Sequence, residues 1–317
     1  MAESRDREYA ARLFLAWAND RYRRTFAPTR LDGPVWLAED TEDDGPGGRI
    51  ALVADRLFEA KDAWNERRAV LERRLDESRP GSYLLWAPPG GVLPADEPDQ
   101  SEWVRRVVLA ASRLASGRKG EARLPAKLTL AKVRDEGGYA SVTGGLARHW
   151  TAITERVQGT FYVDSRAIHR FTRDETEREQ LFEQIARLSK GLDKGNAVEF
   201  EHEDAWSVQR LPRGPAASGM RDGWAITGCP DAFDPGDGAA IRRLLRSRLA
   251  AANQALSGHT DAVRALVLVG AYDYIEAENA GPALRGFNPA LAAAFDVAVV
   301  VADAEVKPII LKRSLPW

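Results

Sequence analysis

The sequence predicts an α/β protein, in which a mixed β-sheet flanked by helices forms the C-terminal part and a smaller α+β region precedes it. Segments whose apolar residues recur at helical spacing alternate with short apolar or alternating segments typical of strands. Glycine- and proline-rich breakers separate them. The chain has 317 residues, 44% of them hydrophobic and 29% charged, which is enough for one large domain or two of ordinary size.

The N-terminal α+β region is expected over residues 1–120. Its first helix is predicted at about 5–25, because Leu13, Phe14 and Trp17 recur at helical spacing. An acidic Gly/Pro loop at 39–48 separates two strands. The remaining elements are strands at 35–37, 49–53 and 83–86 and helices at about 57–78 and 101–116.

The C-terminal α/β domain is expected over residues 121–317. Alternation at 127–133, a turn at 135–138 and a return strand at 139–143 predict a β-hairpin. Helices and strands then alternate, which favours a mixed sheet. They are expected as helices at about 146–157, 172–190, 239–256 and 288–294, strands at 160–163, 223–227 and 264–270, and a final hairpin of 297–301 and 305–311.

Composition excludes several classes of function. The net charge of −2 and the pI near 6.2 remove the bulk attraction to phosphate of a polybasic protein, so any nucleic-acid contact must be local. A single cysteine, Cys229, allows neither an intramolecular disulfide nor a thiolate zinc site. No signal peptide or apolar run of membrane-spanning length is recognised, so a cytoplasmic protein is expected.

The segment 196–211, NAVEFEHEDAWSVQRL, is the most informative part of the chain and is predicted as a strand-turn-strand unit. The two-residue period of a strand places Glu199, Glu201 and Glu203 on one face. Three carboxylates on one face suit Mg²⁺ or Mn²⁺, which prefer oxygen ligands. Glu201, Glu203 and Asp204 are therefore the candidate metal ligands. The alternative is a solvated strand face that binds nothing.

The order helix, acidic strand, second strand, third strand, helix, strand over about 172–269 resembles the core of restriction-endonuclease-like nucleases. In that family, an acidic residue on one strand and a (D/E)xK triplet on the next converge on a divalent metal that activates water. The resemblance implies that Glu203 or Asp204 stands for the acid and that Ser207-Val208-Gln209 occupies the triplet. Because Gln209 stands where the family has lysine, the resemblance implies a degenerate site that binds nucleic acid without cutting it.

Other motifs are weaker. Glu305-Val306-Lys307, preceded by Asp296, spells a better triplet, but the predicted hairpin places Asp296 on the other face. The turn at 141–146 lacks the lysine of a P-loop and the third glycine of a dinucleotide fingerprint, so no nucleotide cofactor is implied. The residues of a possible catalytic triad have no supporting sequence context; they are His149, Asp164, Ser165 and His169.

A stripe of arginines on the helix at 239–256 is the candidate phosphate contact. Arg242 and Arg246 lie at neighbouring positions on one helical face, and a solvated face is the alternative interpretation. Nine tryptophans are spread along the chain, which suits a core or a protein interface.

We therefore expect a nucleic-acid-associated protein with a degenerate restriction-endonuclease-like core, placed by analogy in a bacterial restriction or genome-defence system. The alternative is a non-catalytic subunit of a multiprotein assembly, since a protein partner is expected and no complete catalytic motif is present. A hydrolase with a His/Asp site is a third hypothesis. The sequence leaves open whether the protein is an enzyme.

Overall fold

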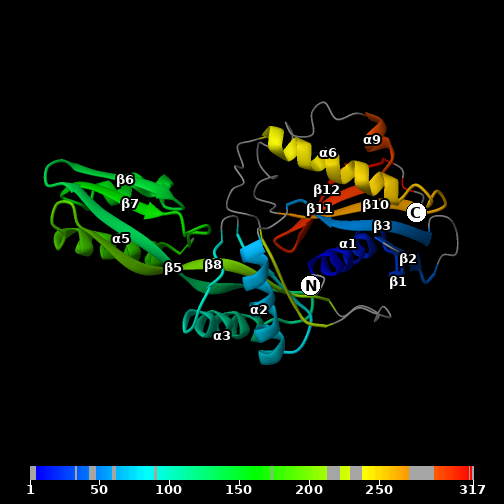
Figure 1. Ribbon diagram of the computed structural model, residues 1–317, viewed down its shortest axis with the longest axis horizontal. Helices are drawn as coiled ribbons and strands as arrows, with labels where there is room; N and C mark the ends of the chain where they lie inside the picture. Colours follow the sequence, from blue (N-terminus) through cyan, green and yellow to red (C-terminus); the bar gives the residue numbers. More distant parts are fainter. Residues whose placement is uncertain are drawn as a thin grey trace. The chain divides into compact units, whose positions relative to one another are not determined.

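The computed structural model describes residues 5–32, 34–42, 48–58, 62–88, 91–172, 174–212, 222–228, 238–270, 289–313 and 315 (Figure 1). The expectation for Cys229 lies outside this part of the chain. Helices and two mixed six-stranded sheets make up the structure, which confirms the α/β class. None of the described helices is long and apolar enough to cross a lipid bilayer.

The chain folds into two compact units. Unit 1 comprises Met1–Pro89, Ala111–Gly120 and Ser207–Trp317, and unit 2 comprises Gly90–Ala110 and Glu121–Trp206. This division differs from the predicted split at residue 120. Two long strands, β5 (Lys119–Arg134) and β8 (Ala197–Arg210), each contribute residues to both units, and the alternation of a strand does not show where such a crossing falls.

Unit 1 contains one complete sheet, with strand order β1-β2-β3-β10-β11-β12. The antiparallel strands β1 (Phe26–Asp32), β2 (Val35–Asp40) and β3 (Arg49–Arg56) form a meander. β3 pairs in parallel with β10 (Val263–Val269), β10 pairs in parallel with β11 (Val297–Ala302), and β12 (Glu305–Leu311) returns antiparallel to β11. The predicted hairpin at the C-terminal end is thereby observed.

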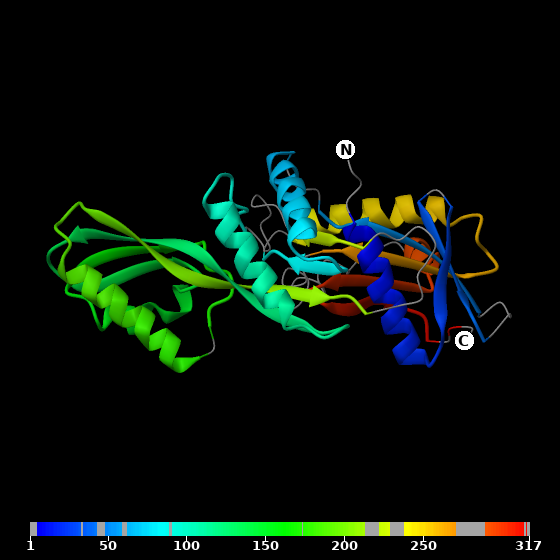
Figure 2. The same ribbon diagram turned by 90° about the horizontal axis from the view of Figure 1, so that it is seen from below.

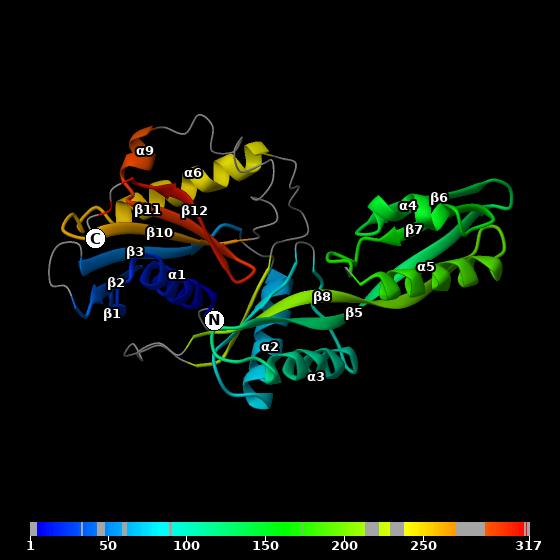
Figure 3. The ribbon, with the colours of Figure 1, turned by 180° about the vertical axis from the view of Figure 1, so that it is seen from behind.

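Helices cover both faces of this sheet. α1 (Asp6–Tyr22) lies on one face and α6 (Gly238–Ala255), with α9 (Pro289–Ala293) beside it, lies on the other (Figures 1 and 3). β10 and β11 are buried along almost their whole length, as their unbroken apolar sequences require of central parallel strands. A buried aromatic side chain, Tyr9, fixes α1 by donating its hydroxyl to the Gly223 carbonyl at 2.7 Å.

The second sheet has the order β6-β7-β5-β8-β4-β9. In unit 1 it contributes β4 (Tyr83–Trp86), β9 (Trp224–Thr227) and the last residues of β8, and α2 (Asp62–Ser78) packs on β9. The predicted strand-turn-strand unit at 196–211 is instead the single strand β8. The strands predicted for a core at 172–269 therefore lie in two sheets, because β10 belongs to the first sheet and β4 separates β8 from β9.

Unit 2 contains the remaining strands of this sheet, a short 3-10 helix η2 (Ala147–His149) and three described α-helices. They are α3 (Asp99–Ser112, mostly in this unit), α4 (Trp150–Thr154) and α5 (Glu175–Lys190). β6 (Gly138–Gly144) does not form the predicted hairpin with β5. β7 (Gly159–Ser165) lies between them, parallel to β6 and antiparallel to β5. The short turn at 135–138 thus connects two strands that are not neighbours, which local alternation could not show.

Leu266→Ala, in the middle of β10, is expected to lower the free energy of unfolding of unit 1 by about 3 kcal/mol, because its fully buried side chain leaves a cavity when it is removed. Urea denaturation followed by tryptophan fluorescence measures the change. Leu311→Ala, on the edge strand β12, is the matched control and should cost less than about 1 kcal/mol, since that side chain is 38% exposed. Equal losses would contradict the burial of β10 between two helical layers.

Candidate functional site

The structure does not bring the predicted metal ligands together. Glu199, Glu201 and Glu203 are exposed on one face of β8, as their spacing predicts. Asp204 follows Glu203 directly and is buried on the opposite face, because consecutive side chains of a strand alternate. The ligand set of Glu201, Glu203 and Asp204 is therefore corrected: its three carboxylates cannot converge on one ion from a regular strand.

Asp204 has a structural role in unit 2. It is 2% exposed, and one carboxylate oxygen accepts the backbone N–H groups of His169 at 3.0 Å and Arg170 at 2.9 Å. The other oxygen lies 3.0 Å from both His169 Nδ1 and the Trp206 indole nitrogen. A buried carboxylate bonded to so many partners fixes the segment before α5 to β8.

The other two positions of the predicted nuclease site, Glu203 and Gln209, belong to different units. Glu203 forms an ion pair with Arg106 of α3. Gln209 is buried in unit 1 opposite Leu84, and its side-chain oxygen has no hydrogen-bond partner in the described part of the chain. Within the described ranges, no three His, Cys, Asp or Glu side chains lie close enough to hold a metal ion. Binding of Mg²⁺ or Mn²⁺ thus stays a prediction, and the described residues do not supply a set of ligands for it.

The weaker motifs do not assemble either. Asp296 accepts from Lys312 at 2.6 Å, whereas Glu305 pairs with Lys119 at 3.5 Å. The Ser165 hydroxyl donates to the Thr143 carbonyl and accepts the Leu146 N–H, so the glycine turn uses that N–H internally. Asp164 pairs with Arg166, and His169 pairs with Asp204. These contacts do not connect a nucleophile, a base and an acid as a catalytic triad requires.

A different site lies in unit 1, at the carboxyl ends of parallel strands, where open α/β sheets commonly bind ligands. β3 ends at Arg56, β10 at Val269 and β9 at Thr227, and side chains from these ends line one pocket. The pocket is shallow: its enclosed volume is about 10 Å³, which is room for about one water molecule. The lining residues are Asp6, Arg56, Phe58, Trp64, Asn65, Arg68, Thr227, Gly228 and Val269.

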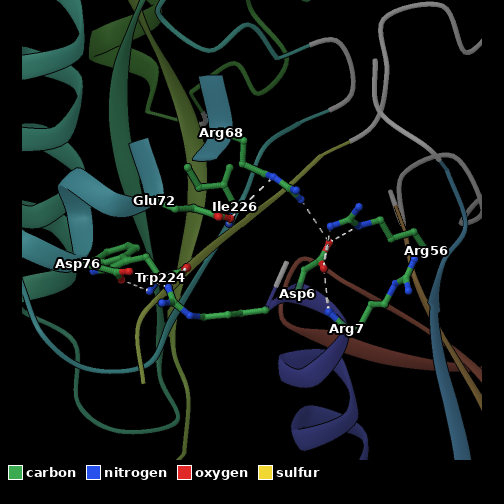
Figure 4. Close-up of polar contacts among 9 residues, drawn as sticks. Asp6, Arg7, Arg56, Arg68, Glu72, Asp76, Trp224 and Ile226 are labelled. Carbon is green, nitrogen blue, oxygen red and sulfur yellow. Dashed lines mark hydrogen bonds and ion pairs between the residues drawn. The ribbon is translucent and has the colours of Figure 1, made fainter. Parts of the chain in front are cut away.

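An ion pair between α1 and β3 forms the centre of this pocket (Figure 4). Asp6 is only 1% exposed, and Arg56 binds its carboxylate in a bidentate manner, with Nε at 2.5 Å from one oxygen and Nη2 at 3.0 Å from the other. Arg68 of α2 approaches the same carboxylate, with its Nη1 at 3.9 Å. Two guanidinium groups therefore surround one buried carboxylate.

Glu72, one helical turn beyond Arg68, adds an ionisable group with an unusual pKa. Burial raises the pKa of its carboxyl to about 7, although Arg68 at 3.9 Å and the Ile226 N–H at 2.8 Å oppose the shift. Burial also lowers the pKa of Arg68. Both shifts have the same cause, because burial removes water and so disfavours the charged form of each side chain.

A second set of contacts fixes the scaffold beside the pocket. Arg5 donates to Asp76 of α2 at 2.7 Å, and the other oxygen of Asp76 accepts the Trp224 N–H at 2.6 Å. α1, α2 and β9 are thereby joined through one carboxylate (Figure 4). Asp55 is likewise held by Arg7 at 3.3 Å and by Arg248 of α6 at 3.1 Å.

The predicted phosphate contacts lie on α6 of the same unit. Arg246 is exposed and Arg242 is partly buried, so the two do not form an evenly exposed basic stripe. The sequence missed Arg56 and Arg68 as site residues. The sequence shows that Asp55-Arg56 and Thr227-Gly228 each follow an apolar strand, but it does not show that these two ends, which belong to different sheets, line one pocket.

Comparison with models of known protein families, with functionally characterised proteins and with solved structures finds no significant match to this chain.

Glu72→Gln is expected to stabilise unit 1 at pH 8 by up to about 3 kcal/mol and to have little effect at pH 4.5. The pKa is about 7 in the folded protein and near 4.5 when unfolded, so the stability that the protonated carboxyl gives is lost as the pH rises through 7. Urea denaturation across this pH range measures the effect. An equal difference between variant and wild type at pH 4.5 and pH 8 would contradict it.

Asp204→Asn is expected to destabilise unit 2 by about 2–4 kcal/mol, because an amide cannot accept all the hydrogen bonds that the carboxylate receives. Glu201→Gln, on the exposed face of the same strand, is the matched control and should change stability by no more than about 0.5 kcal/mol. Similar losses of stability for both variants in thermal unfolding would show that Asp204 does not fix the segment before α5 to β8.

Proposed function

We propose that this protein binds nucleic acid without cutting it, through a restriction-endonuclease-like core in unit 1. The support is an element order in a single sheet. α1, β1, β2 and β3 come first in the chain, and α6 and β10 follow after the elements from α2 to β9. This order of helix, three strands, helix and strand is similar to the one expected over 172–269, but it has no acidic strand in second place.

The Arg56–Asp6 pair is the observation that carries the proposal of binding without cleavage. In the family, acidic residues gather around a divalent cation. β3 carries no (D/E)xK triplet, and at its carboxyl end the buried Asp6 is neutralised by the guanidinium of Arg56. A buried carboxylate needs a positive partner, and here a side chain supplies the charge that a metal would otherwise supply.

A phosphodiester at the mouth of the pocket is the ligand class that its guanidinium groups suit. Guanidinium groups bind phosphate oxygens in bidentate geometry, and Arg68 and Asn65 line the pocket beside Arg56. With a net charge of −2, the protein has no general attraction to nucleic acid, so such a local cluster must supply the contact. Membership in a restriction or genome-defence system rests on the family resemblance.

Arg68→Gln is expected to weaken binding of a fluorescently labelled DNA duplex roughly 5–10-fold in EDTA and to reduce the salt dependence by about one phosphate contact. Fluorescence anisotropy measures the affinity, and gel analysis after incubation with Mg²⁺ or Mn²⁺ is expected to show intact DNA. Arg73→Gln, an exposed arginine on the same helix, is the control for charge and should bind like wild type.

Arg68→Lys keeps the charge and controls for folding, and thermal unfolding shows that each variant is intact. Metal-dependent cleavage by the wild type, or equal binding by the Arg68 and Arg73 variants, would contradict the proposal.

The second candidate function, a non-catalytic subunit of a larger assembly, is favoured by apolar side chains that unit 2 exposes, Val92 at 67% and Leu109 at 49%. Affinity purification from the host with nuclease treatment separates the candidates. Two results together would favour the role of a non-catalytic subunit: a stoichiometric protein partner stays bound after nuclease treatment, and the purified protein binds no DNA.

A further inference from the structure

One face of the sheet in unit 2 is bare. The core of this unit packs α4 and α5 against the side chains of β5, β6 and β7 that point to one side, among them Leu128, Ala140 and Phe161. On the other side, β6, β7 and the part of β5 that pairs with β7 carry no helix in the described part of unit 2 (Figure 2). α3 contacts the remaining part of β5 and β8 through Arg106. The side chains of this bare face are exposed or half-buried.

Strand register places the residues of the bare face in rows. Tyr162 on β7 lies between Ser141 on β6 and Ala131 on β5. Paired residues of neighbouring strands share a face, so these three side chains point to the same side. The adjacent rows are Tyr139, Thr160 and Arg134 on one side and Thr143, Asp164 and Thr129 on the other.

Two tyrosines give aromatic surface to the bare face and to its edge. Tyr139, on the edge strand β6, is 49% exposed, and its ring lies at the edge of the sheet, 6.1 Å from that of Trp150 on α4. Tyr162, on the central strand, is half-buried, and its hydroxyl lies 3.0 Å from the Thr143 hydroxyl, which fixes the direction of the ring. Rings held on a rigid sheet can stack on planar ligands with little loss of entropy.

The charges on the bare face divide it into two parts. Arg134 lies in the row on one side of Tyr162, and on the other side Asp164 is paired with Arg166, whose side chain is 76% exposed. Lys127 adds a further positive charge on β5. β8, at the border of the face, instead exposes Glu199 and Glu201. The part over β5, β6 and β7 therefore suits an anionic ligand, and the acidic strand bounds it.

We propose that the bare face over β5, β6 and β7 binds single-stranded nucleic acid. Bases stack on Tyr162 and Tyr139, and phosphates contact Arg134 and Arg166. The hydroxyl-bearing side chains between them, Ser141 and Thr160, offer hydrogen bonds to base edges or sugars. This inference deepens the proposed function, since it gives the same protein a second contact, specific for unpaired strands.

The test measures anisotropy of labelled single-stranded oligothymidine and oligouridine and of a DNA duplex. Tyr162→Ala is expected to weaken single-strand binding roughly tenfold or more, while duplex binding through Arg68 stays unchanged. Tyr162→Phe keeps the ring and should bind like wild type. Glu201→Gln, on the acidic border, should bind a single strand as tightly as wild type or more tightly.

The outcomes separate this inference from the proposed function. Loss of single-strand binding in Tyr162→Ala but not in Arg68→Gln supports the inference even if duplex binding is absent. Unchanged single-strand binding in Tyr162→Ala overturns it. A protein partner that the wild type retains after nuclease treatment, and that Tyr162→Ala loses, would overturn it too. The bare face would then be a protein-docking surface.

Discussion

The buried carboxylate of Asp6 imposes the constraint on which unit 1 depends. A carboxylate that is 1% exposed must be neutralised, and the guanidinium of Arg56 meets this need from the end of β3. The pair fixes the first turn of α1 over the carboxyl end of the sheet. α1 then covers β10 and β11, and Arg5 in the same turn reaches Asp76 of α2. One ion pair thus determines where the pocket forms and which residues line it.

The same pair gives the pocket its chemical character. Carboxylates that face one another invite a metal ion, whereas a carboxylate bonded by two N–H donors of arginine has little need of one. Arg68, held between Asp6 and Glu72 at 3.9 Å from each, extends the positive charge into the pocket. Glu72, with a pKa of about 7, loses most of its negative charge below neutrality, which leaves the guanidinium groups to dominate the local field.

Local patterns in the sequence predicted much of this structure. The apolar runs of β10 and β11, the final hairpin and the exposed face formed by Glu199, Glu201 and Glu203 follow from periodicity alone. The pairing of strands does not follow from periodicity, because β7, which comes later in the chain, lies between β5 and β6 in the sheet. The site was also beyond prediction, since Asp6, Arg56 and Arg68 come from separate elements and meet only in the folded protein.

Manganese binding tests the central claim most directly, namely that Arg56 takes the place of a metal at Asp6. Mn²⁺ titrated into the wild-type protein can be followed by the electron paramagnetic resonance signal of the free ion. We expect the free signal to rise in proportion from the first addition, with no stoichiometric uptake. Tight uptake of one ion per chain that Asp6→Asn abolishes would contradict the claim and restore a metal-dependent centre.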